Sequence, residues 1–265
     1  MSKIGGIFKR RKALIAYVTV GYPSIEATLA VVPLLAEWGC DAVELGIPFS
    51  DPMADGTTIQ QASQVALHNG VNTAACLEVS GSLSRKTSIP LIFMSYLNPL
   101  YRYGLERFSR SSAAAGIEAL IIPDLPPEEG EELERITAGD GLGLIYMLAP
   151  TSTQRRIRLV GQRARGFIYL VSLTGVTGAR GGALPPLTEY ISRVRLETAA
   201  PLCVGFGIST PEQAGQAAEM ADGVIIGSRL IQLMAIGDNW SELESFIRQT
   251  RACLDGASFK PVGGR

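Results

Sequence analysis

The chain has 265 residues, of which 46% are hydrophobic, and its 24 basic and 25 acidic residues give a formal net charge of −1. A chain of this length and composition can bury a large core, and we expect one barrel-sized domain over residues 1–265. The two signs of charge are well mixed, which gives no footprint for nucleic acid or an anionic membrane and leaves small metabolites as candidate ligands.

The first apolar run, at 13–20, follows a basic segment. It is too short for a signal peptide, lacks a small-residue cleavage site and ends in Gly-Tyr-Pro, so we interpret it as a strand behind a lead-in of residues 1–12. No apolar stretch approaches the roughly 20 residues of a membrane helix. We therefore expect a soluble protein.

Cysteine and histidine usage argues against metal and triad chemistry. The cysteines at 40, 76, 203 and 253 are scattered, lack metal-ligand spacing and lie in apolar contexts typical of reduced, buried thiols, which favours the cytoplasm. The only histidine, His68, lies near the end of a predicted helix and is better suited to surface capping than to catalysis. A Ser-His-Asp triad or a multi-histidine metal site is excluded, and we expect no metal.

Short apolar, β-branched runs alternate with amphipathic stretches along the chain. The runs predict eight strands, at 13–20, 41–45, 89–94, 119–122, 143–148, 167–171, 201–205 and 222–226. The stretches predict helices at 25–38, 57–67, 73–83, 104–115, 128–137, 153–164, 187–196 and 211–220. Such alternation requires parallel pairing with right-handed crossovers, so we predict a closed (β/α)8 barrel, with a doubly wound open sheet as the alternative.

Residues unusual for a buried strand gather where the predicted strands end. Glu44 ends the second strand and Tyr169 lies late in the sixth, whereas the others follow strands three, four, seven and eight: Tyr96, Asn98, Asp124, Phe206, Gly207, Gly227 and Ser228. In a barrel these carboxyl ends form one mouth, where the active sites of this fold lie.

Two carboxylates in the segment 43–60 are candidates for proton transfer. Glu44 ends an apolar strand, where burial of an unpaired carboxylate is costly or raises its pKa toward neutrality. Asp55 follows Pro48 and Pro52 in a loop that could return it over the same pocket. The alternative is structural: Glu44 caps a helix or pairs with an arginine, and Asp55, like Asp51, is a turn former before the helix at 57–67.

Glycines after the last three predicted strands suggest a phosphate site. They occur in the segments 175–178, 205–208 and 227–228, where backbone N–H groups can approach an oxyanion and a short helix after the last strand adds its dipole. The segment 172–186 is rich in glycine and has no apolar period, so we interpret it as a lid that excludes water and brings Thr177 and Gly178 to the ligand.

Several motifs occur together in one order: VELGIPFSDPMADG, MSYLNPLYRYG, IIPDLPPEE, YLVSLTGVTGAR, GFGIS and DGVIIGS. With them the chain closely resembles the α subunit of tryptophan synthase from about residue 12 onward. The resemblance implies a TIM barrel that cleaves indole-3-glycerol phosphate to indole and glyceraldehyde 3-phosphate without cofactor or metal. It also implies a pyridoxal-phosphate (PLP) β subunit as partner in an αββα complex.

The resemblance also assigns roles to individual positions. Glu44 and Asp55 match the family's catalytic acids, and Tyr169 matches a tyrosine that faces the substrate. Tyr17, Tyr96 and Phe206 match the lining of the indole slot, and Thr177 matches the mobile loop. The positions that match phosphate-binding residues are Gly178, Gly207, Gly227 and Ser228.

Three positions depart from the family pattern. Tyr22 stands where aspartate is usual, Thr57 replaces a frequent proline, and Arg229 follows Gly227-Ser228 where a small residue is usual. Arg229 could add a cation near the phosphate or point to solvent. Two other functions stay open at this stage: a stand-alone lyase that releases free indole, and a non-catalytic subunit that only senses a ligand.

Overall fold

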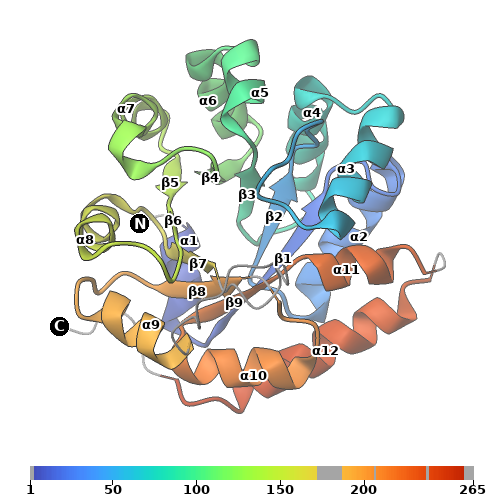
Figure 1. Cartoon of the computed structure of the whole chain (residues 1–265). Helices are drawn as coiled ribbons and strands as arrows, with labels where there is room; N and C mark the ends of the chain where they lie inside the picture. Colours follow the sequence, from blue (N-terminus) through green and yellow to red (C-terminus); the bar gives the residue numbers. More distant parts are fainter. Residues whose placement is uncertain (1–2, 172–186, 206, 237–238, 260–265) are drawn as a thin grey trace.

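The computed structural model describes residues 3–171, 187–205, 207–236 and 239–259. Within them, parallel strands form one sheet at the centre, with helices around it (Figure 1). The strands are β1 (Ala13–Thr19), β2 (Ala42–Gly46), β3 (Leu91–Met94), β4 (Ile117–Ile121), β5 (Gly143–Ile145), β6 (Met147–Leu148), β7 (Ile168–Val171), β8 (Leu202–Gly205) and β9 (Gly223–Ile226). Their order in the sheet is β5-β4-β3-β2-β1-β9-β8-β7-β6.

The two ends of this sheet belong to one stretch of chain, the predicted strand 143–148. β5 pairs with β4 and β6 pairs with β7, and the residue between them, Tyr146, accepts a hydrogen bond from the backbone N–H of Tyr169 at 3.0 Å. The strands therefore form a nearly closed barrel, which confirms the (β/α)8 fold and excludes the open sheet. The prediction of one uninterrupted strand is wrong at Tyr146, whose buried hydroxyl donates to Glu134 in the surrounding helix layer.

Helices connect the strands and cover the outside of the barrel. They are α1 (Lys3–Gly6), η1 (Ile7–Lys9), α2 (Ile25–Trp38), α3 (Thr57–His68), α4 (Thr73–Leu83), α5 (Leu97–Tyr103), α6 (Leu105–Ala114), η2 (Pro127–Glu129), α7 (Glu131–Gly139), α8 (Gln154–Arg163), α9 (Leu187–Arg195), α10 (Pro211–Met220), α11 (Ser228–Met234) and α12 (Ser241–Asp255). The bounds of α2, α4 and α10 agree with the sequence prediction. Helices α1, α5 and α12 were not predicted from the sequence.

Alternation along each strand separates two apolar layers. In β1, Ala13, Ile15 and Tyr17 belong to a cluster that also contains side chains of the other strands and fills the barrel, whereas Leu14 and Val18 belong to the larger cluster beneath the helices. Every residue of β1 and β2 is buried, because a parallel sheet inside a ring of helices has no solvated face.

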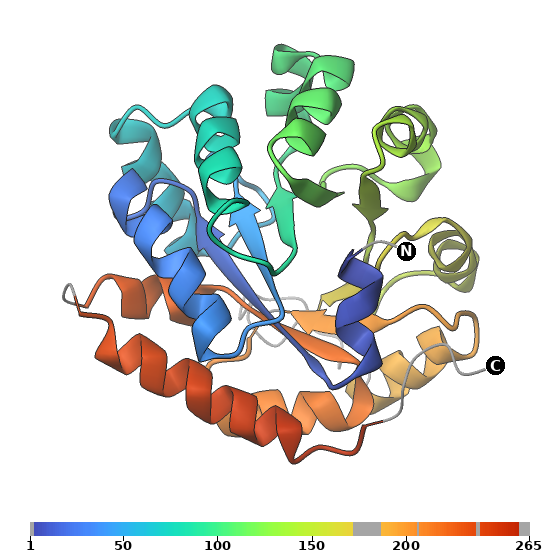
Figure 2. The same cartoon turned by 180° about the vertical axis from the view of Figure 1, so that it is seen from behind.

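The N-terminal segment closes the barrel at the end where the strands begin. Ile4 of α1 and Phe8 of η1 belong to the interior cluster, and the Phe8 ring meets the Phe167 ring edge-on with 5.9 Å between centroids. Figure 2 shows α1 across this end of the barrel. Ile4 and Phe8, in the described part of the predicted lead-in 1–12, thus form an apolar plug at this end of the barrel.

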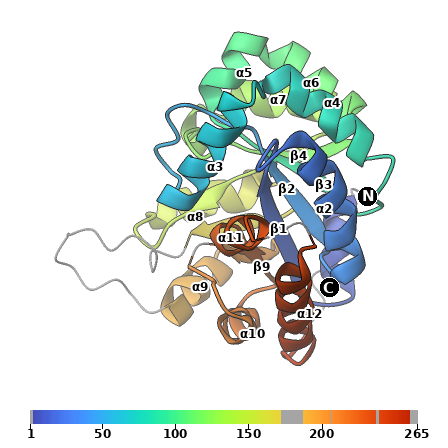
Figure 3. The same cartoon turned by 90° about the vertical axis from the view of Figure 1, so that its right-hand side faces the viewer.

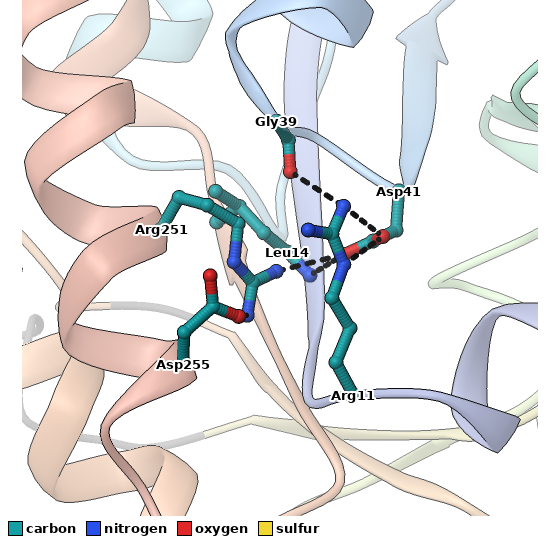
Figure 4. Close-up of polar contacts among 6 residues, drawn as sticks. All are labelled: Arg11, Leu14, Gly39, Asp41, Arg251 and Asp255. Atoms are coloured by element: carbon teal, nitrogen blue, oxygen red, sulfur yellow. Dashed lines mark hydrogen bonds and ion pairs between the residues drawn. The ribbon is translucent and has the colours of Figure 1, made fainter.

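A charged cluster joins the first and last elements of the barrel near the start of β1 and β2 (Figure 4). The Asp41 carboxylate accepts hydrogen bonds from Arg11 at 2.8 Å, from Arg251 of α12 at 2.9 Å and from the backbone N–H of Leu14 at 2.9 Å. Arg251 also pairs with Asp255 at 2.8 Å. These bonds attach α12 to the region beside α2, where the ring of helices closes (Figure 3).

We expect Asp41→Ala to lower the free energy of unfolding by about 3 kcal/mol, because it leaves the buried Arg251 guanidinium without its main partner. The matched control is Glu244→Ala, which removes an exposed ion pair with Arg248 on α12 and should cost less than about 1 kcal/mol. Urea titration at neutral pH measures both. Equal losses for the two variants would contradict the stabilising role of the cluster.

Candidate active site

A cavity of about 1100 Å³ lies at the carboxyl ends of the strands, at the mouth that the sequence predicted. Six of the predicted site residues line it: Tyr17, Asp55, Tyr169, Gly207, Gly227 and Ser228. Glu44 and Tyr96 are not part of the lining and lie behind it. Thr177, Gly178, Phe206 and the predicted lid 172–186 lie outside the described residues. A second cavity, of about 890 Å³, lies outside the barrel between α7 and α8 and contains none of the predicted site residues.

Glu44 is a fully buried acid in the middle of β2, which continues to Gly46 rather than ending at Glu44 as predicted. In the sheet it lies beside Tyr17 of β1 and Ile92 of β3. Neither carboxyl oxygen has a hydrogen-bond partner, so the expected alternatives, a helix cap or an arginine pair, are absent among the described residues. Burial raises the pKa of Glu44 to about 8, and the side chain is therefore mainly protonated at neutral pH.

Two buried tyrosines line the cavity: Tyr17, which is the sheet neighbour of this acid, and Tyr169 of β7. Tyr17 and Tyr169 need glycine opposite their hydroxyl groups, because a Cβ atom at Gly46 would overlap the Tyr17 hydroxyl and one at Gly205 would overlap the Tyr169 hydroxyl. Tyr169 is the second residue of β7, not late in the strand as predicted. Each tyrosine hydroxyl thus lies against the glycine that ends a neighbouring strand, and a larger residue in place of that glycine would leave no room for it.

Asp55 lies in the loop between β2 and α3, and one of its carboxylate oxygens is committed. Oδ2 accepts a hydrogen bond from the Tyr96 hydroxyl at 3.1 Å, and that hydroxyl accepts one from the backbone N–H of Ala54 at 2.9 Å. The buried Oδ1 has no partner. Burial raises the pKa of Asp55 to about 6 and the Tyr96 bond opposes this rise, so the carboxylate is ionised at neutral pH.

The electrostatics show how the two acids are arranged. Burial raises the pKa values of Tyr17 and Tyr169, and the charges of both Glu44 and Asp55 raise them further. Neither acid raises the pKa of the other. Both acids therefore act on the same pair of tyrosines, of which Tyr17 is the sheet neighbour of Glu44.

Backbone groups form the opposite part of the cavity wall. Gly207 has φ +78°, a conformation that favours glycine, and a Cβ atom at Gly227 would lie 3.3 Å from Tyr17. Helix α11 begins at Ser228, as the sequence predicted for a short helix after the last strand. This part of the wall has the small residues expected where an oxyanion approaches the backbone.

Other predicted features have structural roles or lie apart from the site. Asp124 accepts the backbone N–H of Leu97 at 2.9 Å, Asn98 is part of α5, and His68 is the exposed last residue of α3. No disulfide joins the four cysteines, of which only Cys253 is not fully buried. The described residues contain no cluster of three acidic, histidine or cysteine side chains that could hold a metal ion, and no helix among them could span a membrane.

Two residues that shape the site, Gln60 and Gly46, were not predicted from the sequence. Gln60 of α3 donates from Nε2 to the backbone carbonyl of Asp55 at 2.9 Å, which attaches the loop to the helix after it. Gly46 provides the space that Tyr17 occupies. Gln60 lies in the first turn of α3, directly after the loop that carries Asp55, and Gly46 follows Glu44 by two residues. Their closeness to the two acids in the sequence is the feature from which they could have been predicted.

The fold and the cavity together define a barrel of the enzyme class whose active sites lie at the carboxyl ends of the strands, with the acids Glu44 and Asp55 near that mouth. The family model described as "Tryptophan synthase alpha chain" matches residues 7–257. The chain belongs to this family, as its motifs indicated, and the enzyme of which such chains are a component is a lyase of tryptophan biosynthesis.

Relatives and solved structures agree with this membership. The chain is 53% identical to the tryptophan synthase alpha chain of Dehalococcoides mccartyi, over 96% of this chain and 100% of that one. It is 50% identical to that of Chloroflexus aurantiacus, over 87% and 89%. The tryptophan synthase subunit alpha of Legionella pneumophila superposes with a TM-score of 0.88 at 36% identity, over 96% of this chain and 99% of that one. A Mycobacterium tuberculosis tryptophan synthase chain gives 0.87 at 34%, over 96% and 99%.

The burial of Glu44 predicts a pH-dependent change in stability. The unfolded chain ionises this carboxyl near pH 4.5, whereas the folded protein keeps it protonated up to about pH 8, so the wild type loses stability as the pH rises between these values. Glu44→Gln cannot ionise. We expect its free energy of unfolding, relative to wild type, to increase by a few kcal/mol from pH 5 to pH 8.

Denaturant titrations at several pH values measure this difference. The control Glu106→Gln makes the same chemical change at an exposed position of α6 and should leave the pH dependence unchanged. A constant difference between Glu44→Gln and wild type from pH 5 to pH 8 would rule out a raised pKa for Glu44.

Proposed function

We propose that this chain catalyses the cleavage of indole-3-glycerol phosphate to indole and D-glyceraldehyde 3-phosphate, as the α subunit of a tryptophan synthase. The observation that carries the proposal is that Asp55, with one unpaired oxygen, lines the cavity together with Tyr17 and Tyr169, and that the unpaired acid Glu44 lies beside Tyr17 in the sheet. In this retro-aldol reaction the bond between indole C3 and the side chain breaks, C3 gains a proton and the adjacent hydroxyl loses one. No net acid or base is consumed.

Glu44 is proposed to carry the proton. A carboxyl group that is protonated at neutral pH can donate to indole C3, and the resulting carboxylate can accept the proton of the hydroxyl as the aldehyde forms. Glu44 lies behind the cavity wall and must turn toward the substrate. Because neither of its oxygens has a hydrogen-bond partner, this rotation breaks no hydrogen bond.

Asp55 is proposed to hold the other end of the heteroaromatic ring. Its ionised carboxylate keeps Oδ1 available to accept the indole N–H, whose positive character increases when C3 is protonated. Tyr96 donates a hydrogen bond to Oδ2 and thereby holds Asp55 in place. We therefore propose that Tyr96 acts on the indole slot through this acid. Tyr17 and Tyr169 provide apolar ring surface between the acids, and Phe206 and Thr177 remain proposed substrate contacts.

The phosphate is proposed to bind against Gly207, Gly227 and Ser228, with Gly178 from the lid segment. Small residues in this wall support the placement, because backbone N–H groups then approach the phosphate oxygens closely. The segment 172–186 is proposed to close over the substrate and exclude water during the reaction.

The remaining proposals concern assembly and context. The family works with a β subunit, and we propose an αββα heterotetramer in which that subunit carries PLP, whereas this chain uses neither cofactor nor metal. We place the protein in the cytoplasm and treat residues 1–265 as one domain. The stand-alone lyase and the non-catalytic ligand-sensing subunit are the alternatives that the following assay separates.

The assay supplies indole-3-glycerol phosphate to the purified chain and measures indole, with and without a tryptophan synthase β subunit. We expect indole formation that the β subunit strongly increases. Glu44→Gln should lower the turnover rate at least about 10²-fold because the proton carrier is lost, while circular dichroism stays unchanged.

Three outcomes would contradict the proposal in different ways. Equal indole release with and without the β subunit would favour the stand-alone lyase. Absence of cleavage in a complex that still makes tryptophan from indole and serine would favour the sensing subunit. Wild-type turnover by folded Glu44→Gln would refute the role of Glu44.

The two carboxyl pKa values predict a bell-shaped pH dependence of kcat/KM. Activity should fall below about pH 6, where Asp55 becomes protonated, and above about pH 8, where Glu44 loses its proton. Tyr96→Phe removes a hydrogen bond that lowers the pKa of Asp55, so the acidic limb should move to higher pH and the alkaline limb should stay.

The exposed Tyr101→Phe on α5 makes the same chemical change away from Asp55 and serves as the control. Rate profiles from pH 5 to pH 9 check the shift. An acidic limb that stays in place in Tyr96→Phe would show that this hydroxyl does not stabilise the Asp55 carboxylate.

A further inference from the structure

Arg229 is an arginine in the cavity wall, beside the small residues Gly227 and Ser228. It is the second residue of α11 and lines the cavity together with Gly207 and Gln232. The sequence left two alternatives for this side chain, a cation near the phosphate or a solvated residue. Its position in the wall favours the first alternative.

The charges of the described lining explain why this arginine matters. Its ionised side chains are Asp55, Asp124, Arg156 and Arg229. Arg156 is already engaged by both oxygens of Glu128, each at 3.1 Å. Arg229 has no carboxylate partner among the described residues, so it is the cation of this lining that remains available to an anionic ligand.

A neighbouring aromatic ring holds the Arg229 side chain. The Cζ atom of Arg229 lies 5.9 Å from the centroid of the Phe246 ring on α12. A contact with a ring face uses none of the N–H groups of the guanidinium, so these can still donate to a ligand. A planar guanidinium with two parallel donors matches two oxygens of a phosphate group.

We propose that Arg229 binds the phosphate group of the substrate and offsets the negative charge of Asp55 and Asp124 at the cavity. This inference rests on the proposed function, because it assigns the phosphate of the same substrate to the same end of the cavity. A phosphate is unchanged during cleavage of the remote carbon–carbon bond. Arg229 therefore stabilises the bound substrate and the transition state equally, and it acts on KM rather than on kcat.

The test compares Arg229→Gln with wild type in steady-state kinetics on indole-3-glycerol phosphate. We expect KM to rise about tenfold, as for loss of a hydrogen bond to a charged group, with kcat unchanged. Added salt should raise KM of the wild type more than KM of the variant, because salt screens the contact that the variant has lost. The matched control is Arg156→Gln, which removes the same charge from the same lining but from a paired arginine, and it should change KM less than about twofold.

Calorimetric titration with inorganic phosphate provides a readout that does not need turnover. Wild type and Arg156→Gln should bind phosphate alike, and Arg229→Gln should bind it about tenfold more weakly. A KM or phosphate affinity that is unchanged in Arg229→Gln, or changed equally in Arg156→Gln, would overturn the inference. If the wild type bound phosphate through Arg229 but never cleaved the substrate, the proposed function would fail while the assignment of Arg229 would stand.

Discussion

The burial of a single carboxyl group inside the barrel is the constraint on which the site depends. Glu44 occupies a strand position where the pleat directs its side chain into the interior, and neither of its carboxyl oxygens has a hydrogen-bond partner among the described residues. Water cannot solvate the charge there, so the group holds its proton at neutral pH. The absence of hydrogen-bond partners makes this position unfavourable for an ionised carboxylate. It suits the proposed role of Glu44, in which the carboxyl group donates a proton and then regains one.

The second acid differs because its surroundings differ. Asp55 is attached to a loop rather than a strand, and the Tyr96 hydroxyl supports its charged form. Two carboxyl groups eleven residues apart in sequence thus differ in pKa, at about 8 and about 6, and take opposite protonation states at neutral pH. The proposed acid–base catalysis uses such a division of roles, which follows here from the complete burial of Glu44 and the Tyr96 hydrogen bond to Asp55.

Stability and chemistry are located at opposite ends of the barrel. The apolar plug of Ile4 and Phe8 and the charged cluster around Asp41 lie where the strands begin, and the Asp41 carboxylate accepts hydrogen bonds there from Leu14 and Arg251. The mouth has the reverse character, with unpaired carboxyl oxygens and an arginine without an acidic partner among the described residues. The interactions at one end therefore close the barrel, and the site at the other end contains carboxyl oxygens that lack hydrogen-bond partners.

The sequence by itself determined the alternation of strands and helices, and hence the parallel barrel, because the apolar periodicity of each segment is local. It also indicated the mouth, and its motifs indicated the family. It did not determine the interruption at Tyr146, whose hydroxyl bonds to Glu134 in the helix layer. The helix α12 has buried residues at helical spacing, from Leu243 to Leu254, so its pattern was present in the sequence although the helix was not predicted. Only the tertiary structure decided which acid keeps its proton, which oxygen of Asp55 is free and which arginine lacks a partner. Protonation and pairing depend on what surrounds a side chain in three dimensions, and residues from many separate strands and helices form those surroundings.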